Sequence, residues 1–463
     1  MKSHVSLNAE ENYIRMTQTP VKKLILQLST PTIISMLITS FYSLTDTIFV
    51  SRLGTTSSAA VGVVYSLMSM IQAIGITFGQ GSANTVSRLL GEKKRQTANE
   101  LFSTAFFSSL LLAALLSALG LGFTLSLVRF LGATETIEPY AVAYASTILL
   151  GAPWMTVCYT MNNNLRSEGK AFLGMVGMSS GAILNVVLDP LFIFVFGMGI
   201  RGAALATIIS QFVSFCILLS HFIFKRSNLT LSLRNFRLKK SYYASIFVVG
   251  SPSLIRNILH TVSAICLNVF SAPFGDAAIA AMSITTRVMQ FLNSALIGFG
   301  QGLQPVAGFS WGARLYRRLL DAFRFCVFTG VVSFTLLAVV CFFGAEYIMR
   351  LFLSDPQVIT IGTLAIRLQC IMMPITAFNT LTGMVFQSTS HGGTSSLLAF
   401  ARQGLFFVPV VVLLPKLMGL LGIQLSQPIA DVCTFVLSLF CIIPFLKLLT
   451  TLQKKEEAIA TLE

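Results

Sequence analysis

The chain has 463 residues, of which 54% are hydrophobic and only 11% are charged, and its mean hydropathy is +0.79. A soluble globular protein carries about 25% charged residues, so this composition excludes that class. Apolar runs of about 20 residues recur along the whole length, each long enough to cross a bilayer as a helix. The runs do not alternate apolar and polar residues, which excludes a membrane β-barrel. The sequence therefore predicts an all-α polytopic membrane protein.

Twelve transmembrane helices are predicted in chain order. The first 23 residues are polar and charged, without a short apolar core and cleavage site, so we expect a cytoplasmic tail over 1–23 and no removable signal peptide. The first six helices are expected near 24–50, 58–86, 101–126, 141–165, 172–196 and 201–224. The other six are expected near 243–272, 278–308, 320–344, 360–386, 396–415 and 422–449.

A long hydrophilic and basic stretch divides these helices into two sets of six. We therefore predict an N-lobe over 24–224, a cytoplasmic linker over 225–242 and a C-lobe over 243–449. A short charged tail over 450–463 is expected to be cytoplasmic.

The net charge of +15 is distributed unevenly between the loops. Basic residues cluster in alternate loops, around Lys22, Arg88 to Arg95, Arg166 to Lys170, Lys225 to Lys240, Arg314 to Arg324 and Lys447 to Lys455. The intervening loops hold only Arg52, Arg129, Arg201, Arg350 and Lys416. This asymmetry follows the positive-inside rule and predicts that both termini are cytoplasmic. The clusters indicate topology determinants and lipid-headgroup contacts rather than a nucleic-acid site.

The two halves of the chain repeat one another. Gly79-Gln80-Gly81 recurs as Gly300-Gln301-Gly302, and we call this difference in numbering, 300 − 79 = 221, the repeat offset. The same offset relates Pro31 to Pro252, Gly54 to Gly275, Gly91 to Gly312 and Pro153 to Pro374. Since Pro and Gly determine bends and close contacts, matched positions indicate matched helix shapes. The pattern predicts a parallel 6+6 duplication, which is typical of rocking transporters with a site between two lobes.

Two acids lie inside the apolar runs of the first half. Asp46 is near the outer end of the first helix, and Asp189 is at a similar depth in the fifth, one turn after Asn185 on the same face. Pro190 removes a backbone hydrogen bond and bends that helix. Acids at this depth are costly and are functional candidates, so we predict a proton or cation site to which Thr207 of the next helix adds a hydroxyl. The alternatives are a helix-end Asp beside a structural proline and, for Thr207, a hydroxyl bonded to the helix backbone.

The second half carries neither acid, because the repeat offset relates Asp46 to Leu267 and Asp189 to Val410. Its seventh helix instead holds Arg256, Asn257 and His260, and we predict that these residues line a substrate cavity. The alternative is a structural pair with a carbonyl or with Asp431. Arg287 and Arg367 also lie within spans, whereas Arg402 is expected near a helix end, with its guanidinium reaching the interface.

Enzymatic and metal chemistry are not indicated. The eight cysteines are scattered singly, and the four histidines form no cluster with cysteines or acids. No nucleophile with clustered loop acids and no nucleotide-binding motif is present. The sequence therefore predicts no catalytic residue, no metal site and no cofactor, and it favours a secondary transporter over an ATP-driven pump.

An ordered set of motifs resembles one transporter family. It comprises Pro31, the run from Tyr42 to Val50 with Gly54, Ser87 to Gly91, Leu184 to Ile193, Gly199 to Thr207, and Arg402-Gln403 followed by Pro409. The set resembles the MATE family of multidrug and toxin extrusion transporters, closest to its MepA-like bacterial branch. The resemblance covers nearly the whole chain.

The resemblance implies two six-helix lobes in a V and multidrug efflux of cationic, amphipathic compounds by H⁺ or Na⁺ antiport with alternating access. It implies that Asp46, Asn185, Asp189 and Thr207 form the cation-coupling site, with Tyr42 at a neighbouring position as a further candidate for the substrate cavity. Some members use acids in helices seven and ten, where this chain has Arg256, His260 and Arg367 instead.

Location and partners follow from the same resemblance. It implies a monomer in the bacterial plasma (inner) membrane that contacts lipids and small-molecule drugs, contributes to antibiotic resistance, and needs no cofactor beyond the coupling ion. The alternative within the superfamily is a flippase or exporter of a lipid-linked saccharide. Such a protein would usually have extra helices and a strongly cationic cavity, and Arg256, Arg287 and Arg367 keep that alternative open.

Overall fold

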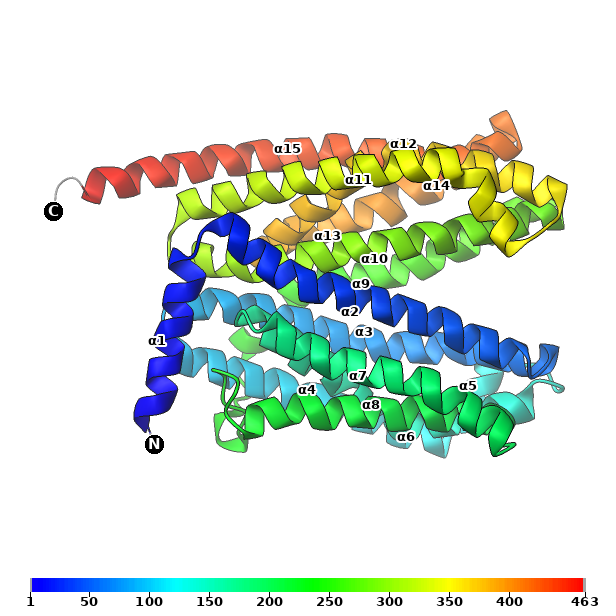
Figure 1. Cartoon of the computed structure of the whole chain (residues 1–463), viewed down its shortest axis with the longest axis horizontal. Helices are drawn as coiled ribbons and strands as arrows, with labels where there is room; N and C mark the ends of the chain where they lie inside the picture. The colour runs from blue at the N-terminus through cyan, green and yellow to red at the C-terminus, as the bar shows by residue number, and fades with distance from the viewer. Residues whose placement is uncertain (1, 461–463) are drawn as a thin grey trace. The chain divides into compact units, whose positions relative to one another are not determined.

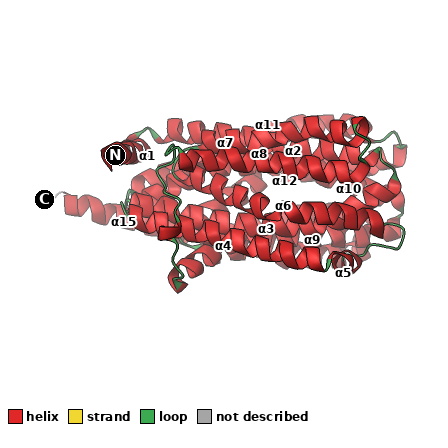
Figure 2. Ribbon diagram, turned by 90° about the horizontal axis from the view of Figure 1, so that it is seen from below, coloured by secondary structure: helices red, strands yellow, loops and turns green. Residues whose placement is uncertain are grey.

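The computed structural model describes residues 2–460, and every regular element in this range is helical (Figures 1 and 2). The first half contains α1 (Lys2–Gln18), α2 (Val21–Ser51), α3 (Thr55–Gly91), α4 (Arg95–Gly122), α5 (Thr124–Phe130), α6 (Glu138–Ser167), α7 (Ala171–Pro190), η1 (Leu191–Val195), α8 (Gly199–Ile223) and η2 (Leu233–Asn235). The second half contains α9 (Lys240–Ser271), η3 (Ala272–Phe274), α10 (Asp276–Gly312), α11 (Tyr316–Phe352), α12 (Pro356–Ser388), α13 (Gly392–Phe400), η4 (Ala401–Phe406), α14 (Phe407–Met418) and α15 (Leu420–Ala460).

Within the described residues, eleven helices are long and apolar enough to cross a membrane. The eighth predicted helix, near 278–308, corresponds to α10 and is not among them, although α10 has 37 residues like its repeat partner α3. Buried polar side chains such as Gln301 and Gln304 lower its hydropathy. The prediction of an all-α, multi-pass membrane protein is confirmed.

The structure keeps the register of the repeat. The helices α3, α4 and α7 begin at Thr55, Arg95 and Ala171, and the repeat offset relates these starts to those of α10, α11 and α13 at Asp276, Tyr316 and Gly392. Matched glycines and prolines therefore produce matched helix starts.

The chain forms two compact units whose boundaries lie inside helices. Unit 1 comprises Met1–Thr19 with Thr30–Gly250, and unit 2 comprises Pro20–Ser29 with Ser251–Glu463. The first turns of α2 thus belong to unit 2, and the first turns of α9 belong to unit 1. This division differs from the predicted one, which placed the boundary in the linker over 225–242. The two division points, after Ser29 and after Gly250, are themselves related by the repeat offset.

Close glycine contacts explain this exchange of helix ends. A Cβ atom on Gly81 of α3 would lie 2.0 Å from the backbone oxygen of Ile246 in α9, inside unit 1. A Cβ atom on Gly302 of α10 would lie 2.1 Å from Ser29 Oγ in α2, inside unit 2. The Ser29 hydroxyl also donates to the Phe299 carbonyl at 3.0 Å. The repeated Gly-Gln-Gly motif therefore lets each of these helices approach the N-terminal part of a helix from the other half of the sequence.

We expect Gly81→Ala to destabilise the protein by about 1–3 kcal/mol, because the added methyl meets a backbone carbonyl that cannot move aside. The measurement is the thermal melting temperature of purified protein in detergent. Gly62→Ala on the same helix is the matched control, since a Cβ atom there meets nothing within 4 Å. An equal or higher melting temperature for Gly81→Ala than for Gly62→Ala would contradict the close α3–α9 packing.

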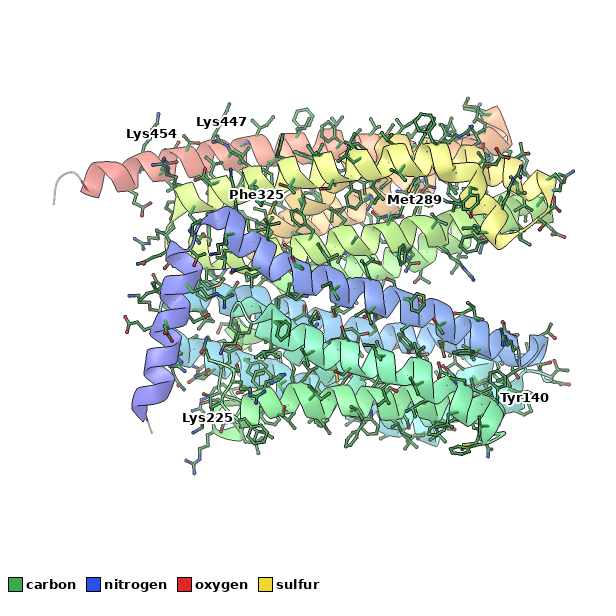
Figure 3. All side chains as sticks on the ribbon, viewed as in Figure 1. Tyr140, Lys225, Met289, Phe325, Lys447 and Lys454 are labelled. Carbon is green, nitrogen blue, oxygen red and sulfur yellow. The ribbon has the colours of Figure 1, made fainter. Side chains whose placement is uncertain are left out.

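The basic linker lies against one end of unit 1. Figure 3 shows Lys225 at this end, which we call the basic end, and Tyr140 at the opposite end. Ser227 Oγ and the Asn228 backbone nitrogen both donate to the buried Glu168 carboxylate, each at 2.6 Å. Burial raises the pKa of Glu168, and these hydrogen bonds oppose that rise. The linker is thus held by specific contacts rather than extending freely.

The predicted tails contain helices. The segment predicted as the tail over 1–23 contains α1, which runs across the basic end of unit 1 (Figure 1), where Asn12 Nδ2 donates to the Glu168 carbonyl at 2.9 Å. At the other terminus, α15 continues through most of the predicted tail to Ala460.

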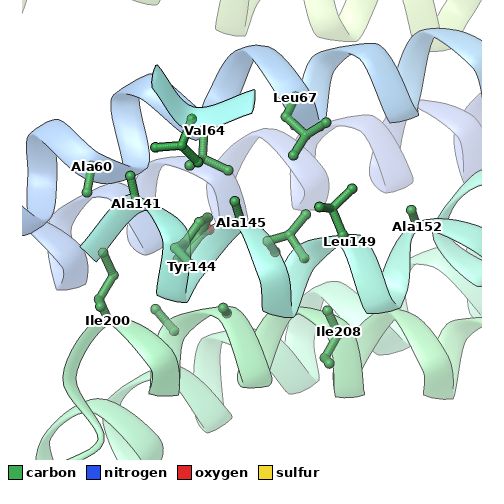
Figure 4. Packing of buried hydrophobic residues seen from close by; sticks show 14 of the residues in the cluster. Ala60, Val64, Leu67, Ala141, Tyr144, Ala145, Leu149, Ala152, Ile200 and Ile208 are labelled. Atoms are coloured by element: carbon green, nitrogen blue, oxygen red, sulfur yellow. The ribbon is translucent and has the colours of Figure 1, made fainter. Parts of the chain in front are cut away.

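One core cluster of unit 1 is made mainly of small and aliphatic side chains between α3, α6 and α8 (Figure 4). Val64 and Leu67 of α3 meet Ala145 and Leu149 of α6, and Ile208 of α8 packs on the other side of α6. Small residues allow close helix approach in a membrane, where van der Waals packing replaces the hydrophobic effect between helices. This rigid packing holds α6 and α8 beside the polar residues described next.

Candidate functional site

Three helices of unit 1 bring the predicted polar residues together. Asp46 comes from α2, Asn185 and Asp189 from α7, and Thr207 from α8. The exposed fractions of Asn185, Asp189 and Thr207 are 1%, 0% and 1%, whereas Asp46 is half-buried. The cost of burying these groups is offset only if they bind one another or a ligand.

The Asn185 amide links α7 to α8. Its nitrogen donates to Asp189 Oδ2 at 2.7 Å, and its oxygen accepts from the Thr207 backbone nitrogen at 3.2 Å, once the amide is oriented to satisfy both groups. The opposite orientation would face the amide oxygen towards the Asp189 carboxylate. The Thr207 hydroxyl donates to the Ala203 carbonyl at 3.1 Å. Asn185 therefore acts as a donor towards the carboxylate.

The carboxyl groups of Asp46 and Asp189 lie close enough to share a hydrogen bond. The Oδ1 atom of each is buried and has no hydrogen-bond partner among the described residues. Two carboxylates at this separation repel one another strongly in a medium of low dielectric constant. The pair is therefore suited to hold one shared proton or one monovalent cation.

Two phenols complete the cluster. The hydroxyl groups of Tyr42 and Tyr144 both approach Thr207, and both rings lie near the two carboxyls. Tyr42 was expected beside the cation-coupling residues, and the structure places it near the carboxyl pair. Tyr144 of α6 was missed by the sequence analysis; its only sequence signal is a hydroxyl inside the apolar run over 141–165. It is fully buried, and its hydroxyl contacts Met68 Sδ at 3.7 Å.

The helix that carries Asp189 changes its hydrogen-bonding pattern at Pro190. The α-helix α7 ends there, and η1 continues as a π-helical segment over Leu191–Val195. Pro190 has no amide hydrogen, so the carbonyl of Val186 loses its usual partner one turn earlier. Short π-helical segments are frequent at functional sites. The predicted disruption at Pro190 thus occurs directly after the carboxyl pair.

Unit 2 separates the predicted substrate residues. Arg256 is half-buried on α9, and its Nη2 donates to Ser253 Oγ at 3.1 Å. His260, one turn further, is half-buried as well, and Arg402 acts electrostatically on both residues. Asn257 is exposed and does not join this group. Arg256 and His260 therefore share a face, as predicted from their spacing, and Asn257 lies on another.

A buried ion pair in unit 2 corrects the prediction for Arg402. Its Nε lies 2.6 Å from Asp431 Oδ1, so the guanidinium does not reach the interface as expected. Thr376 Oγ1 donates to Asp431 Oδ2 at 3.1 Å, and Gln427 Nε2 donates to Oδ1 at 3.2 Å. Arg402 lies in the π-helical segment η4. The second half thus carries an intramembrane acid, Asp431 of α15. The repeat offset does not relate its position to Asp46 or Asp189.

The MatE family model matches residues 31–191 and 252–413, and the repeat offset also relates the starts of these two matches. The Multidrug export protein MepA of Staphylococcus haemolyticus is 26% identical over 429 residues, covering 92% of this chain and 94% of the relative. MepA of Staphylococcus saprophyticus is also 26% identical, over 91% of this chain and 93% of its own length.

Solved structures agree with this similarity. One is described as an outward-facing multidrug resistance MATE family transporter; it is 25% identical with a TM-score of 0.89, covering 95% of this chain and 98% of that chain. A MOP superfamily transporter from Pyrococcus furiosus, described as having a binding pocket of reverse polarity, is 25% identical with a TM-score of 0.88, covering 94% and 98%. The MATE-like fold and the non-enzymatic class are confirmed. The chain belongs to the MATE family of membrane transporters.

Proposed function

We propose that the protein is a MepA-like multidrug exporter in which the Asp46–Asp189 pair couples export of organic cations to inward movement of protons. The observation that carries this proposal is the close pair of carboxyls, each with one buried oxygen that has no hydrogen-bond partner among the described residues. The similarity to proteins named for multidrug export supports the transported class. In the proposed orientation, the protein lies in a bacterial plasma membrane, and both termini and the basic end of unit 1 are on its cytoplasmic side.

Coupling requires that the proton and the drug bias the same conformational equilibrium. Protonation neutralises the pair and removes the repulsion between its members, whereas deprotonation leaves a negative charge that attracts a cation. A ligand shifts an equilibrium only by its differential affinity for the two states. The change of helix type after Pro190 gives α7 a local element that can respond to the charge on Asp189.

The hydrogen bonds favour a proton over Na⁺. A sodium site needs several oxygens directed at one point, and Asn185 and Thr207 were predicted to supply two of them. In the satisfied orientation the Asn185 nitrogen faces Asp189, and the amide oxygen accepts from the Thr207 backbone. The Asn185 oxygen is therefore not directed at the pair, which supports coupling to H⁺.

Drug export is favoured over transport of a lipid-linked saccharide. Three intramembrane arginines kept the lipid-linked saccharide alternative open in the sequence. Arg367 Nε donates to the Phe342 carbonyl at 3.3 Å, and its guanidinium lies over the Phe342 ring. Arg287 is exposed, and Arg256 is bonded to Ser253. Two of these arginines are thus engaged by groups of the protein itself, which supports drug export over transport of a phosphate-bearing lipid.

The test is efflux of ethidium from proteoliposomes containing the purified protein, under an imposed proton gradient or an imposed Na⁺ gradient. We expect proton-driven transport that an uncoupler abolishes. Transport with Na⁺ alone would overturn the proposed coupling ion. Absence of transport of every cation tested, together with transport of a lipid-linked saccharide, would overturn the proposed substrate class.

We expect Arg256→Leu and His260→Leu to change the relative transport rates of different cationic drugs while leaving expression and folding intact. The reason is that both residues place polar groups on one half-buried face, close enough to Arg402 to interact with its charge. The measurement is the resistance profile of cells expressing each variant against several drugs. Asn257→Leu, whose side chain lies on another face, is the control. Identical profiles for all three variants would show that the pair has a structural role only.

A further inference from the structure

One face of α8 carries a line of polar residues that leads away from the carboxyl pair. Thr207, Ser210, Ser214, Leu218 and His221 are spaced three or four residues apart, so they lie one above another on the same face. The exposed fractions of Ser210, Ser214, Leu218 and His221 are 1%, 1%, 0% and 4%. The line begins beside Asn185 and ends in the last turn of α8, at the basic end of unit 1.

Most of the polar atoms on this line have no partner. Ser210 Oγ, Ser214 Oγ and both ring nitrogens of His221 make no hydrogen bond to any described residue. An unsatisfied buried polar group costs about 1–3 kcal/mol. Ser220, on another face of the same helix, shows the ordinary arrangement, because its hydroxyl donates to the Ile217 carbonyl at 2.6 Å. These polar groups therefore do not stabilise the helix, and they are suited to bind water.

The neighbouring helix α7 faces this line with glycines. A Cβ atom on Gly181 would lie 2.1 Å from Ser214 Oγ and 2.6 Å from the Ser210 carbonyl oxygen. The same α7 face continues to Asn185 and Asp189, which are also buried. The Ser214 hydroxyl and the Ser210 backbone thus lie in the α7–α8 interface, on the side of the carboxyl pair that leads to the basic end, and both residues are buried.

Leu218 interrupts the line. A Cβ atom on Gly177 of α7 would lie 2.4 Å from Leu218 Cδ2, so the leucine fills the interface between Ser214 and His221. His221 lies seven positions after Ser214, which corresponds to about 10 Å along a helix. An apolar side chain over this length blocks a continuous chain of hydrogen bonds when α7 and α8 are packed as described.

The far end of the line joins the docked linker. The Arg226 and Ser227 backbone nitrogens donate to the His221 carbonyl at 2.9 and 3.1 Å. Ser227 Oγ in turn donates to the buried Glu168 carboxylate at 2.6 Å. The charged groups around this end are Arg226, which acts on His221, and Glu168 with Lys170. His221 is therefore a titratable group at the last position of the line, next to the basic end.

We propose that Ser210 and Ser214, joined by water molecules, form an internal path that conducts the coupling proton from the Asp46–Asp189 pair to His221, with Leu218 as its barrier. The proposal rests on the proton coupling proposed above. The protonated carboxyl gives up its proton and becomes a carboxylate. Each hydroxyl or water accepts one proton and donates another, and the His221 imidazole becomes imidazolium before releasing the proton to water at the basic end. Movement of α7 about its end at Pro190 separates Gly177 from Leu218 once per cycle.

The first test is the double variant Ser210→Ala/Ser214→Ala in proteoliposomes, with a pH-sensitive dye inside and ethidium as substrate. We expect proton flux and drug export to fall together about tenfold or more, as is typical when a proton-transfer group is removed. The affinity of the detergent-solubilised protein for ethidium should stay unchanged. Ser220→Ala is the matched control and should keep native flux. Native flux in the double variant, or an equal loss of ethidium affinity, would overturn the path.

The second test seeks a gain of function. Leu218→Ser replaces the barrier with a hydroxyl, and we expect a proton leak in the absence of drug that the native protein does not show. No leak from a folded Leu218→Ser variant would overturn the role of Leu218 as the barrier. Transport by the native protein tests whether protons drive export. Na⁺-driven transport would overturn both the proposed coupling and the proposed path. Proton-driven native transport with native flux in the serine double variant would overturn the path only.

Discussion

Asp189→Asn is expected to lower proton-driven drug export about 100-fold or more, because the variant keeps the size of the side chain but cannot release a proton. The carboxyl is fully buried, and Asn185 donates to it. An amide at position 189 mimics the protonated state permanently. We therefore expect the variant to fold normally and to stay biased towards the state in which the proton is bound. The measurement is ethidium efflux from proteoliposomes under an imposed proton gradient.

Asp46→Asn is expected to have a similar effect, and the double variant should be no worse than either single variant. The two carboxyls lie within hydrogen-bond range and act as one site, so removing either member removes its function. Asp321→Asn, which changes an exposed carboxyl on α11, is the control and should transport at the native rate. Full gradient-driven transport by both single variants would refute the site, and additive losses in the double variant would show two independent sites.

Arg402→Met is expected to destabilise the protein by about 3–5 kcal/mol, because it leaves the Asp431 carboxylate buried without its counter-ion. The Asp431 side chain is only 5% exposed, and the two groups meet at 2.6 Å. Asp431→Leu should destabilise the protein by a similar amount, since it leaves the Arg402 guanidinium without its counter-ion. The combined variant Arg402→Met/Asp431→Leu should recover most of the stability, because no unpaired charge remains. Thermal melting in detergent, arranged as a double-mutant cycle, measures the coupling.

An exposed ion pair offers a matched comparison for this cycle. Arg350 Nη2 and Glu346 Oε1 are 2.5 Å apart at the end of α11, with side chains 64% and 51% exposed. Such pairs contribute about 0.2–1 kcal/mol, so Glu346→Gln should change the melting temperature little. If the combined Arg402/Asp431 variant melted at the temperature of the worse single variant, the residues would not act as a pair. Equal shifts for Arg402→Met and Glu346→Gln would refute the burial of the Arg402–Asp431 pair.

The sequence by itself determined the class of the protein, its repeat and the polar residues of the first half. Apolar runs of membrane-spanning length are a local property, so they are visible without a structure. The spacing of Asn185 and Asp189 places both on one helix face for the same reason. The repeat offset followed from glycines and prolines, because these residues fix backbone shape wherever they occur.

Only the tertiary structure decided which distant groups meet. Tyr144 joins the carboxyl pair from α6, and Asp431 of α15 binds Arg402, yet neither contact leaves a periodic signal in the sequence. The division inside α2 and α9 depends on how closely Gly81 and Gly302 let two backbones approach, which hydropathy does not describe. The buried hydroxyls of Ser210 and Ser214 look like ordinary small residues of an apolar helix until α7 is packed against them. Contacts between helices far apart in the chain depend on side-chain shape and backbone distance, and these quantities exist only in the folded protein.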